Sequence, residues 1–245
     1  MDRVKAMKID LKDAKVAVAS ADGSLSIWEK EKKGWKKKKE WKVMAQCLTW
    51  AKPCFGSILA SSNNKEVTIW NEKGKKITHF EVSDEITKLE FGTQEEFMEL
   101  AVCQKNASIS FFRPRNELNA DNWYINETID LDSEVVSFCW NTSIFDTPSF
   151  IATTKTTHIW AFSEKDNKFV RAKEIKGERG IVVWAPIANR DYHLIAIATG
   201  NKVVLWRCEF NYNTKLKELE SINVSPHQTL KIEKPVYSHV YSYRY

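Results

Sequence analysis

The highest local concentration of charge lies between two tryptophans, in the segment Trp35-Lys-Lys-Lys-Lys-Glu-Trp41. Aromatic side chains interleaved with lysines can bind single-stranded nucleic acid, because the rings stack on bases while the ammonium groups contact phosphates. The same pattern suits the outer strand of a sheet, where lysines discourage pairing with the edge of another sheet. We favour the outer strand and keep an RNA-binding adaptor, acting through Lys36–Lys39, as an alternative.

The two tryptophans indicate how such a strand would be held. Side chains alternate along a strand, so Trp35 and Trp41 are expected on one face. Lys37 and Lys39 would share that face and keep their ammonium groups in water while the rings anchor the strand.

The remaining polar residues show no spacing that supports catalysis or metal binding. The five histidines form neither an H-E-x-x-H nor an H-x-H motif, and we interpret His158 and His193 as structural residues of core strands. Asp130 and Asp132 flank the end of a strand-like run, whereas a general acid–base pair needs opposed positions across a cleft. We therefore expect no enzyme, no cofactor, no metal and no small-molecule substrate.

Cysteine and glycine usage points the same way. The five cysteines are scattered without a C-x-x-C motif, so neither disulfides nor a metal centre is expected. Only eight glycines occur, and none builds a phosphate-binding loop.

Composition places the chain among ordinary globular proteins. The 245 residues are 43% hydrophobic and 28% charged, and the net charge of +5 is too modest to indicate nucleic acid as a partner. No apolar run approaches the roughly 18 residues of a membrane span. The charged segment Met1–Lys5 has no signal-peptide core, which predicts a nuclear or cytosolic protein.

A repeated pair of aromatic residues predicts the fold. In four copies an aromatic is followed 20 to 22 positions later by another that closes a β-branched run; a fifth copy has Ile9 before Trp28. The pairs are Trp50 and Trp70, Phe91 and Phe112, Trp140 and Trp160, and Trp184 and Trp206. The closing residues are spaced by 42, 42, 48 and 46 positions, and a period of that size with short strands is typical of a β-propeller.

Each repeat divides into four strands separated by turn signals such as Asp22-Gly23 and Gly200-Asn201. We predict one all-β domain over residues 1–245, a WD-repeat β-propeller with five complete four-stranded blades, a partial sixth and an open ring. The predicted blades span residues 4–42, 44–81, 86–131, 135–175 and 180–222, and the partial blade spans residues 229–245.

Several segments resemble a known family. Residues 48–61, Leu-Thr-Trp-Ala-Lys-Pro-Cys-Phe-Gly-Ser-Ile-Leu-Ala-Ser, resemble the "TWAHPxFGxxLAS" stretch shared by the Sec-thirteen and Seh-type WD-repeat propellers, although no Trp-Asp dipeptide is present. Three further segments are similar to the Seh type in particular. They are Gly34-Trp35 with Trp41, Leu100–Cys103 with the long Arg113–Trp123 loop, and Trp184-Ala-Pro with His193–Thr199.

The resemblance implies a scaffold nucleoporin of the Y-shaped nuclear pore complex at the nuclear envelope, which supports protein and mRNA transport. Its partner would be an α-solenoid nucleoporin that donates strands to the open propeller. The family also implies a second role in a TOR-regulating, coat-like complex at the vacuole or lysosome. The alternative is a Sec-thirteen-like COPII coat component, which the long Arg113–Trp123 loop disfavours.

The C-terminal segment contains the residues that we predict at the interface with the partner. An incomplete ring exposes strand edges that a partner can pair with. The tyrosine-rich end of the chain, with Tyr237, Tyr241 and Tyr243, is our prediction for the edge that meets the donated strand; a frayed terminus is the alternative.

Overall fold

The computed structural model describes residues 4–10, 14–71, 73–185, 192–213 and 218–233. The secondary structure of this part of the chain consists of twenty strands and a single short 3-10 helix, η1 (Pro53–Phe55). No helix among the described residues is both long and apolar enough to cross a membrane. The predicted all-β class is confirmed.

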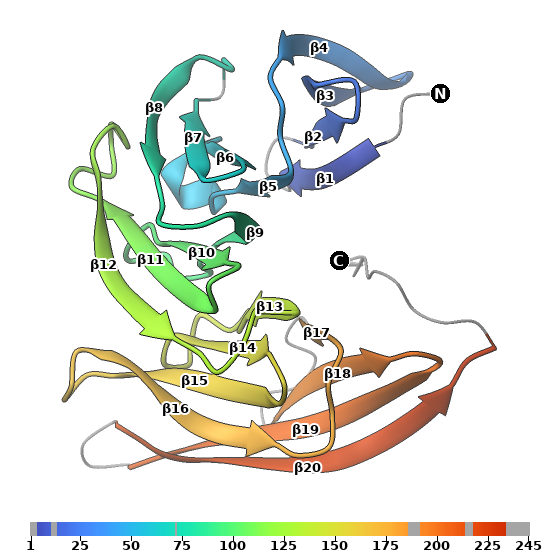
Figure 1. The fold of residues 1–245 in the computed structure, drawn as a ribbon, viewed down its shortest axis with the longest axis vertical. Coiled ribbons are helices and arrows are strands. Elements are labelled where there is room, and N and C mark those ends of the chain that lie inside the picture. Colours follow the sequence, from blue (N-terminus) through green and yellow to red (C-terminus); the bar gives the residue numbers. More distant parts are fainter. Residues whose placement is uncertain (1–3, 11–13, 72, 186–191, 214–217, 234–245) are drawn as a thin grey trace. The chain divides into compact units, whose positions relative to one another are not determined.

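The strands form five four-stranded antiparallel sheets, each made of four consecutive strands in spatial order, as expected of propeller blades (Figure 1). Blade 1 consists of β1 (Val4–Asp10), β2 (Lys15–Ser20), β3 (Ser24–Glu31) and β4 (Gly34–Lys42). Blade 2 consists of β5 (Cys47–Trp50), β6 (Leu59–Asn63), β7 (Glu66–Trp70) and β8 (Lys76–Glu81). Blade 3 consists of β9 (Ile86–Phe91), β10 (Leu100–Gln104), β11 (Ser108–Pro114) and β12 (Trp123–Asp130).

Blades 4 and 5 follow the same plan. Blade 4 consists of β13 (Ser137–Trp140), β14 (Ser149–Thr153), β15 (Thr157–Ser163) and β16 (Lys168–Ile175). Blade 5 consists of β17 (Ile181–Trp184), β18 (His193–Thr199), β19 (Lys202–Tyr212) and β20 (Leu219–Lys231). The five predicted blades of the WD-type propeller are thus confirmed, and every closing aromatic lies on the third strand of its blade.

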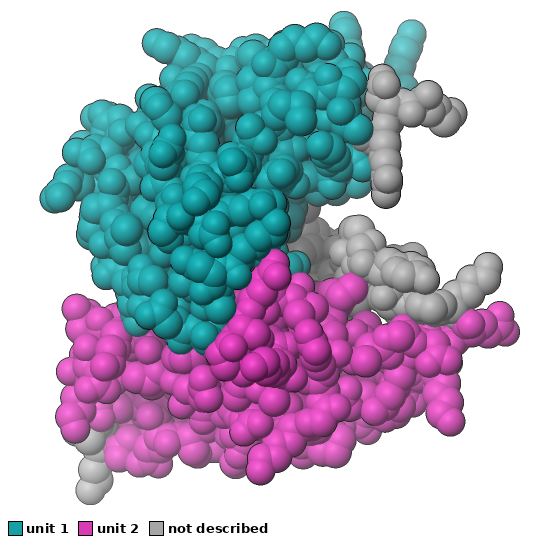
Figure 2. Space-filling model, viewed as in Figure 1, with its two compact units in different colours: residues 1–131 teal, residues 132–245 magenta. Residues whose placement is uncertain are grey.

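The chain divides into two compact units (Figure 2). Unit 1, residues 1–131, contains blades 1 to 3, and unit 2, residues 132–245, contains blades 4 and 5. The assignment of residues 1–245 to a single domain stays a prediction.

Within each unit, neighbouring blades meet through an inner strand. The inner strand of one blade contacts both the inner and the second strand of the preceding blade, as in β5 with β1 and β2, β9 with β5 and β6, and β17 with β13 and β14. The core between blades 1 and 2 includes Ala17, Leu25, Leu48 and Trp70. These apolar contacts hold consecutive sheets together, and the described strands of one blade form no main-chain ladder with those of the next.

A β-bulge recurs at the closing aromatic of every blade. The register between the third and the outer strand shifts just before Trp28, Trp70, Phe112, Trp160 and Trp206. A bulge adds one residue to one strand and increases the local twist. The aromatic repeat of the sequence therefore marks the position at which the side chains of each outer strand switch to the opposite face of the sheet.

This bulge overturns one prediction about the lysine-rich strand β4. In the ladder of β3 and β4, Ile27 pairs with Lys39 but Trp28 pairs with Lys37, so Lys38 is the extra residue. Trp41 and Lys39 face blade 2, whereas Lys37 and Trp35 lie on the opposite face of blade 1. The prediction that Trp35 and Trp41 share a face is wrong, because strict alternation does not survive a bulge.

Trp41 is the tryptophan that anchors the strand. Its ring lies 5.8 Å from the ring of Trp70, centroid to centroid, and it passes directly over the backbone of Gly74. Gly74 has φ +67°, and a Cβ at this position would collide with the indole. Trp35, in contrast, is 47% exposed.

The outer strand of blade 5 is longer than predicted. The sequence interpretation ended blade 5 at Ile222 and assigned residues from 229 onward to a partial sixth blade. In the structure β20 continues to Lys231, with Thr229 opposite Val204 and Lys231 opposite Lys202. Residues 229–231 therefore belong to blade 5, because β19 is long enough to pair with them; residues 234–245 lie outside the described residues.

Candidate functional site: the apolar faces of the first and last blades

Blade 1 has one face packed against blade 2. On this face Ala17 and Ala19 are fully buried and Leu25 is 1% exposed. They form one core with Leu48 and Leu59 of blade 2. Small and branched apolar side chains thus fill the junction between the two sheets.

The opposite face of blade 1 is also apolar, but it is open to solvent. Val4, Met7 and Ile9 of β1 are 55%, 54% and 47% exposed. The register of the sheet continues the face across the next strands: Ile9 lies opposite Val16 and Val16 opposite Trp28. Three large apolar side chains in one strand form a contiguous patch, which is the usual mark of a protein interface.

The middle strands show that this exposure is not general. In β2 the fully buried Ala17 and Ala19 flank the half-buried Val18, and Val16 of the open face is 8% exposed. Residues 59–62 of β6 in blade 2, in contrast, are buried without interruption. A strand buried on both sides is covered on both faces of its sheet. Within unit 1, a neighbouring sheet therefore covers blade 1 on one face only.

A charged rim borders the open face. The ammonium group of Lys37 lies 5.7 Å from the ring centroid of Trp28 and 2.9 Å from Glu40 Oε1. Lys38 Nζ lies 2.7 Å from Glu31 Oε1 and 3.8 Å from Glu29 Oε2. The hydrogen bond with Glu31 raises the pKa of Lys38, and the same contact lowers the pKa of Glu31.

These contacts bear on the two interpretations of the lysine segment. β4 is the outer strand of blade 1, as we favoured, and all of its residues except Trp41 are exposed. Within the run Lys36–Lys39, Lys37 and Lys38 are paired with carboxylates. The nearby carboxylates of Glu31 and Glu40 reduce the positive potential around Lys37 and Lys38, which weakens the case for RNA binding.

Blade 5 carries a second apolar face on its side away from blade 4. Ile181 and Val183 of β17 are half-buried, and Leu230 of β20 is 40% exposed. The register places Ile181, Ala198, Val203 and Leu230 in one row across all four strands. The other face of blade 5, with Trp184 and Ile195, packs on Ile151 and Ile159 of blade 4.

The residues predicted for the interface cannot be placed. Tyr237, Tyr241 and Tyr243 lie outside the described residues. Sequence reasoning missed Met7 and Ile9, although their alternation with Lys8, matched by Val16 and Val18 on the next strand, carried a period-2 signal. That signal marks an apolar face but does not show whether another sheet covers it.

The histidines occupy structural positions. His158 is 5% exposed, its Nε2 lies 2.6 Å from Thr156 Oγ1, and burial lowers its pKa. His193 Nε2 lies 2.9 Å from Asp146 Oδ2, and the hydroxyl of Tyr212 donates to Asp146 Oδ1 at 3.2 Å. These contacts tie the β13–β14 loop to blade 5.

Asp146 is held in its ionised form by this cluster. Burial by itself would raise the pKa of Asp146, but hydrogen bonds from His193, Ser143 and Tyr212 and the charge of His193 outweigh burial, so its pKa lies below the usual value of 3.8. Among the described residues, no cluster of histidine, cysteine, aspartate or glutamate could hold a metal ion.

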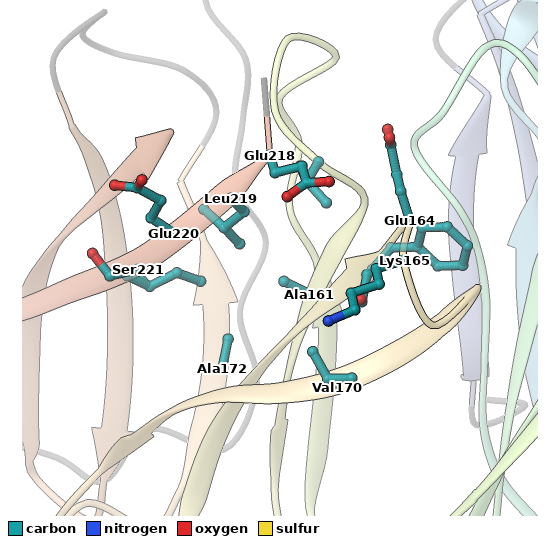
Figure 3. A pocket seen from close by; sticks show the side chains of 13 residues that line it. Ala161, Glu164, Lys165, Val170, Ala172, Glu218, Leu219, Glu220 and Ser221 are labelled. Carbon is teal, nitrogen blue, oxygen red and sulfur yellow. The ribbon is translucent and has the colours of Figure 1, made fainter. Parts of the chain in front are cut away.

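A groove of about 300 Å³ lies between blades 4 and 5 within unit 2 (Figure 3). Its lining combines the aliphatic side chains of Ala161, Val170 and Leu219 with charged groups of the rim. Neither a histidine nor a cysteine is among the lining residues. The groove offers surface for binding.

No protein-family model matches the chain, but individual relatives do. Nucleoporin SEH1 of Homo sapiens is 24% identical over 231 residues, which covers 81% of this chain and 64% of that protein. Nucleoporin SEH1-A of Xenopus laevis is 22% identical over 230 residues with the same coverage. The chain is similar to the SEH1 nucleoporins. The resemblance to the Seh-type propellers is thereby confirmed.

The similarity is partial in extent. The chain spans 64% of the length of these SEH1 relatives. Among solved structures, a chain in "Crystal Structure of Mitotic Checkpoint Complex" superposes with a TM-score of 0.68 at 14% identity, covering 96% of this chain and 67% of that one. At this identity the structural match shows a shared fold and nothing about function.

Proposed function

We propose that this protein is a structural scaffold nucleoporin of the nuclear pore, located at the nuclear envelope, where it supports nucleocytoplasmic transport. Its similarity to the SEH1 nucleoporins supports this role. The observation that carries the proposal is the open apolar face of β1, where Val4, Met7 and Ile9 remain exposed. We further propose that an α-solenoid nucleoporin of the Y-complex covers this face with its own strands, in an open ring of blades.

The packing inside unit 1 supports this mode of binding. Blade 1 contacts blade 2 through a full apolar face, and its opposite face has the same kind of side chains without a neighbouring sheet. In a propeller each blade is stabilised by sheets on both sides, so the first and last blades are the ones that need an added neighbour. Strands donated by a partner would bury Met7 and Ile9 as blade 2 buries Leu25.

Binding to the solenoid partner tests the proposal. The Ile9→Asp variant is expected to lower the affinity of the purified protein for an α-solenoid nucleoporin of the Y-complex by about 100-fold, since a carboxylate would be buried in an apolar contact. Ile125→Asp is the matched control, because Ile125 is 58% exposed on the outer strand of blade 3. Isothermal titration calorimetry measures both affinities.

Two results would contradict the proposal. The first is equal affinity of the wild type and the Ile9→Asp variant, which would place the interface elsewhere. The second is binding to an outer-coat solenoid of the COPII type in preference to the nucleoporin, which would assign the same face to vesicle transport.

A further inference from the structure

The loop between β13 and β14 presents two apolar side chains to solvent. Phe145 is 85% exposed and Ile144 is 46% exposed. A phenylalanine exposed to this degree on a loop tip is unusual, because burying its ring would gain about 2 kcal/mol. The loop lies on unit 2 and is separate from the blade faces considered above.

The equivalent phenylalanines in unit 1 are packed. Phe55 lies five residues after Trp50, just as Phe145 lies five residues after Trp140, and Phe55 is half-buried against the core of blades 2 and 3. In blade 3, Phe97 is covered by the guanidinium of Arg113, whose central carbon lies 3.8 Å from the ring centroid. The outward direction of Phe145 is therefore a property of this blade and not of the repeat.

The loop that carries Phe145 is firmly held. Ser143 is 2% exposed; its backbone N–H donates to Asn141 Oδ1 at 3.0 Å, and its Oγ accepts from the backbone N–H of Phe145 at 3.2 Å. On the other side of the tip, the backbone N–H of Thr147 donates to the Tyr212 hydroxyl at 2.9 Å. A tip that is ordered before binding loses little conformational entropy when a ligand covers it.

Thr147, two residues after Phe145, also lines the groove between blades 4 and 5, so the Phe145 tip lies beside the groove. Figure 3 shows Glu220 on β20, Glu218 directly before the start of this strand, and Glu164 at the β15–β16 turn on the other side of the groove. Lys165 is the one cation among the described lining residues. Within the described part of the chain, Glu164 and Glu218 form no ion pair, and Glu220 Oε1 accepts a hydrogen bond from the Asn213 amide at 2.8 Å.

We propose that the Phe145 tip and this groove bind a protein segment in which lysine or arginine residues stand beside bulky aliphatic side chains. The aliphatic side chains would pack on Phe145 and on the floor of the groove, formed by Ala161, Val170 and Leu219. The cations would pair with Glu164 and Glu218. Carboxylates at the rim repel phosphate groups, which favours a peptide over nucleic acid or an anionic membrane.

Defined peptides test this specificity on the whole chain. The probe is a fluorescein-labelled hexapeptide of alternating lysine and leucine, compared with its glutamate–leucine and lysine–serine counterparts by fluorescence anisotropy. We expect only the lysine–leucine peptide to bind, and we expect its binding to weaken as salt is added. Phe145→Ser is expected to weaken binding about tenfold, and the Glu164→Gln/Glu218→Gln double variant by a similar factor.

A matched control separates a specific site from general stickiness. Leu118 lies on the β11–β12 loop of unit 1 and is 94% exposed. The Leu118→Ser variant should bind the peptide as the wild type does. Thermal unfolding of each variant shows that it is folded. Because neither Phe145 nor the rim lies on the blade 1 face, failure here would leave the proposed nucleoporin function untouched.

Three outcomes would overturn the inference. Equal binding of the glutamate–leucine peptide would remove the role of the acidic rim. Wild-type affinity in both site variants would place the peptide elsewhere. A concentration-dependent dimer in sedimentation equilibrium that is lost in Phe145→Ser would identify a second copy of this chain as the occupant.

Discussion

The two faces of blade 1 have similar chemistry and opposite environments. One face, with Ala17, Ala19 and Leu25, is at most 1% exposed, whereas Met7 and Ile9 on the other face are about half exposed. Both faces belong to the same four-stranded sheet, so strand propensity cannot account for the difference. Both faces of blade 1 carry the apolar side chains that a neighbouring sheet would cover, and the exposed side chains mark the face that has no neighbouring sheet within unit 1.

The apolar face of blade 5 is less exposed than the open face of blade 1. The face of blade 5 away from blade 4 is also apolar, but Ile181, Val183 and Leu205 are half-buried, whereas the apolar β1 side chains of the open face of blade 1 are about half exposed. The larger gain on binding is therefore expected at blade 1, because more apolar area remains to be removed from water there.

The largest expected effect is on the packed face. Leu25→Ala should lower the free energy of unfolding by about 2–4 kcal/mol, since it leaves a cavity between blades 1 and 2. Ile9→Ala should cost less than about 1 kcal/mol, because this side chain is already half in water. Urea unfolding of the isolated protein measures both losses of free energy. Equal losses would show that the two faces do not differ in how tightly their side chains are packed.

A smaller effect is expected where blades 4 and 5 are held by polar contacts. Asp146→Asn should cost about 1.5–3 kcal/mol at pH 7, the usual contribution of hydrogen bonds to a buried charge. The pKa of Asp146 is lower in the folded protein than its usual 3.8, so its contribution is complete above that pH and is lost as the pH falls further.

The difference in stability between the wild type and Asp146→Asn should therefore shrink below about pH 3.8. Urea titrations between pH 7 and pH 2.5 measure this difference. A difference that stays constant over the whole range would show that the charge of Asp146 does not contribute to holding the two blades together.

Much of the fold could be predicted from the sequence. The spacing of Trp28, Trp70, Phe112, Trp160 and Trp206 predicted five blades, because each closing aromatic marks the same position in a local four-stranded unit. Turn residues such as Asp22-Gly23 placed most strand ends correctly. These features depend on residues close in sequence, where local rules are strong.

The details that failed depend on pairing between strands. The bulge at Lys38 separates Trp35 from Trp41, and the extension of β20 to Lys231 is set by the length of β19. Neither follows from the alternation within one strand. The candidate site was missed for a related reason. Met7 and Ile9 look like core residues in the sequence, and they form a surface because no sheet of unit 1 covers them.

The open face of blade 1 is the surface that we expect a partner to cover. Amide hydrogen exchange of β1 and β2, in the free protein and in complex with the α-solenoid nucleoporin, measures this directly. We expect residues 4–9 and 15–20 to become protected on complex formation. Unchanged exchange in these strands, with protection confined to other blades, would contradict this expectation.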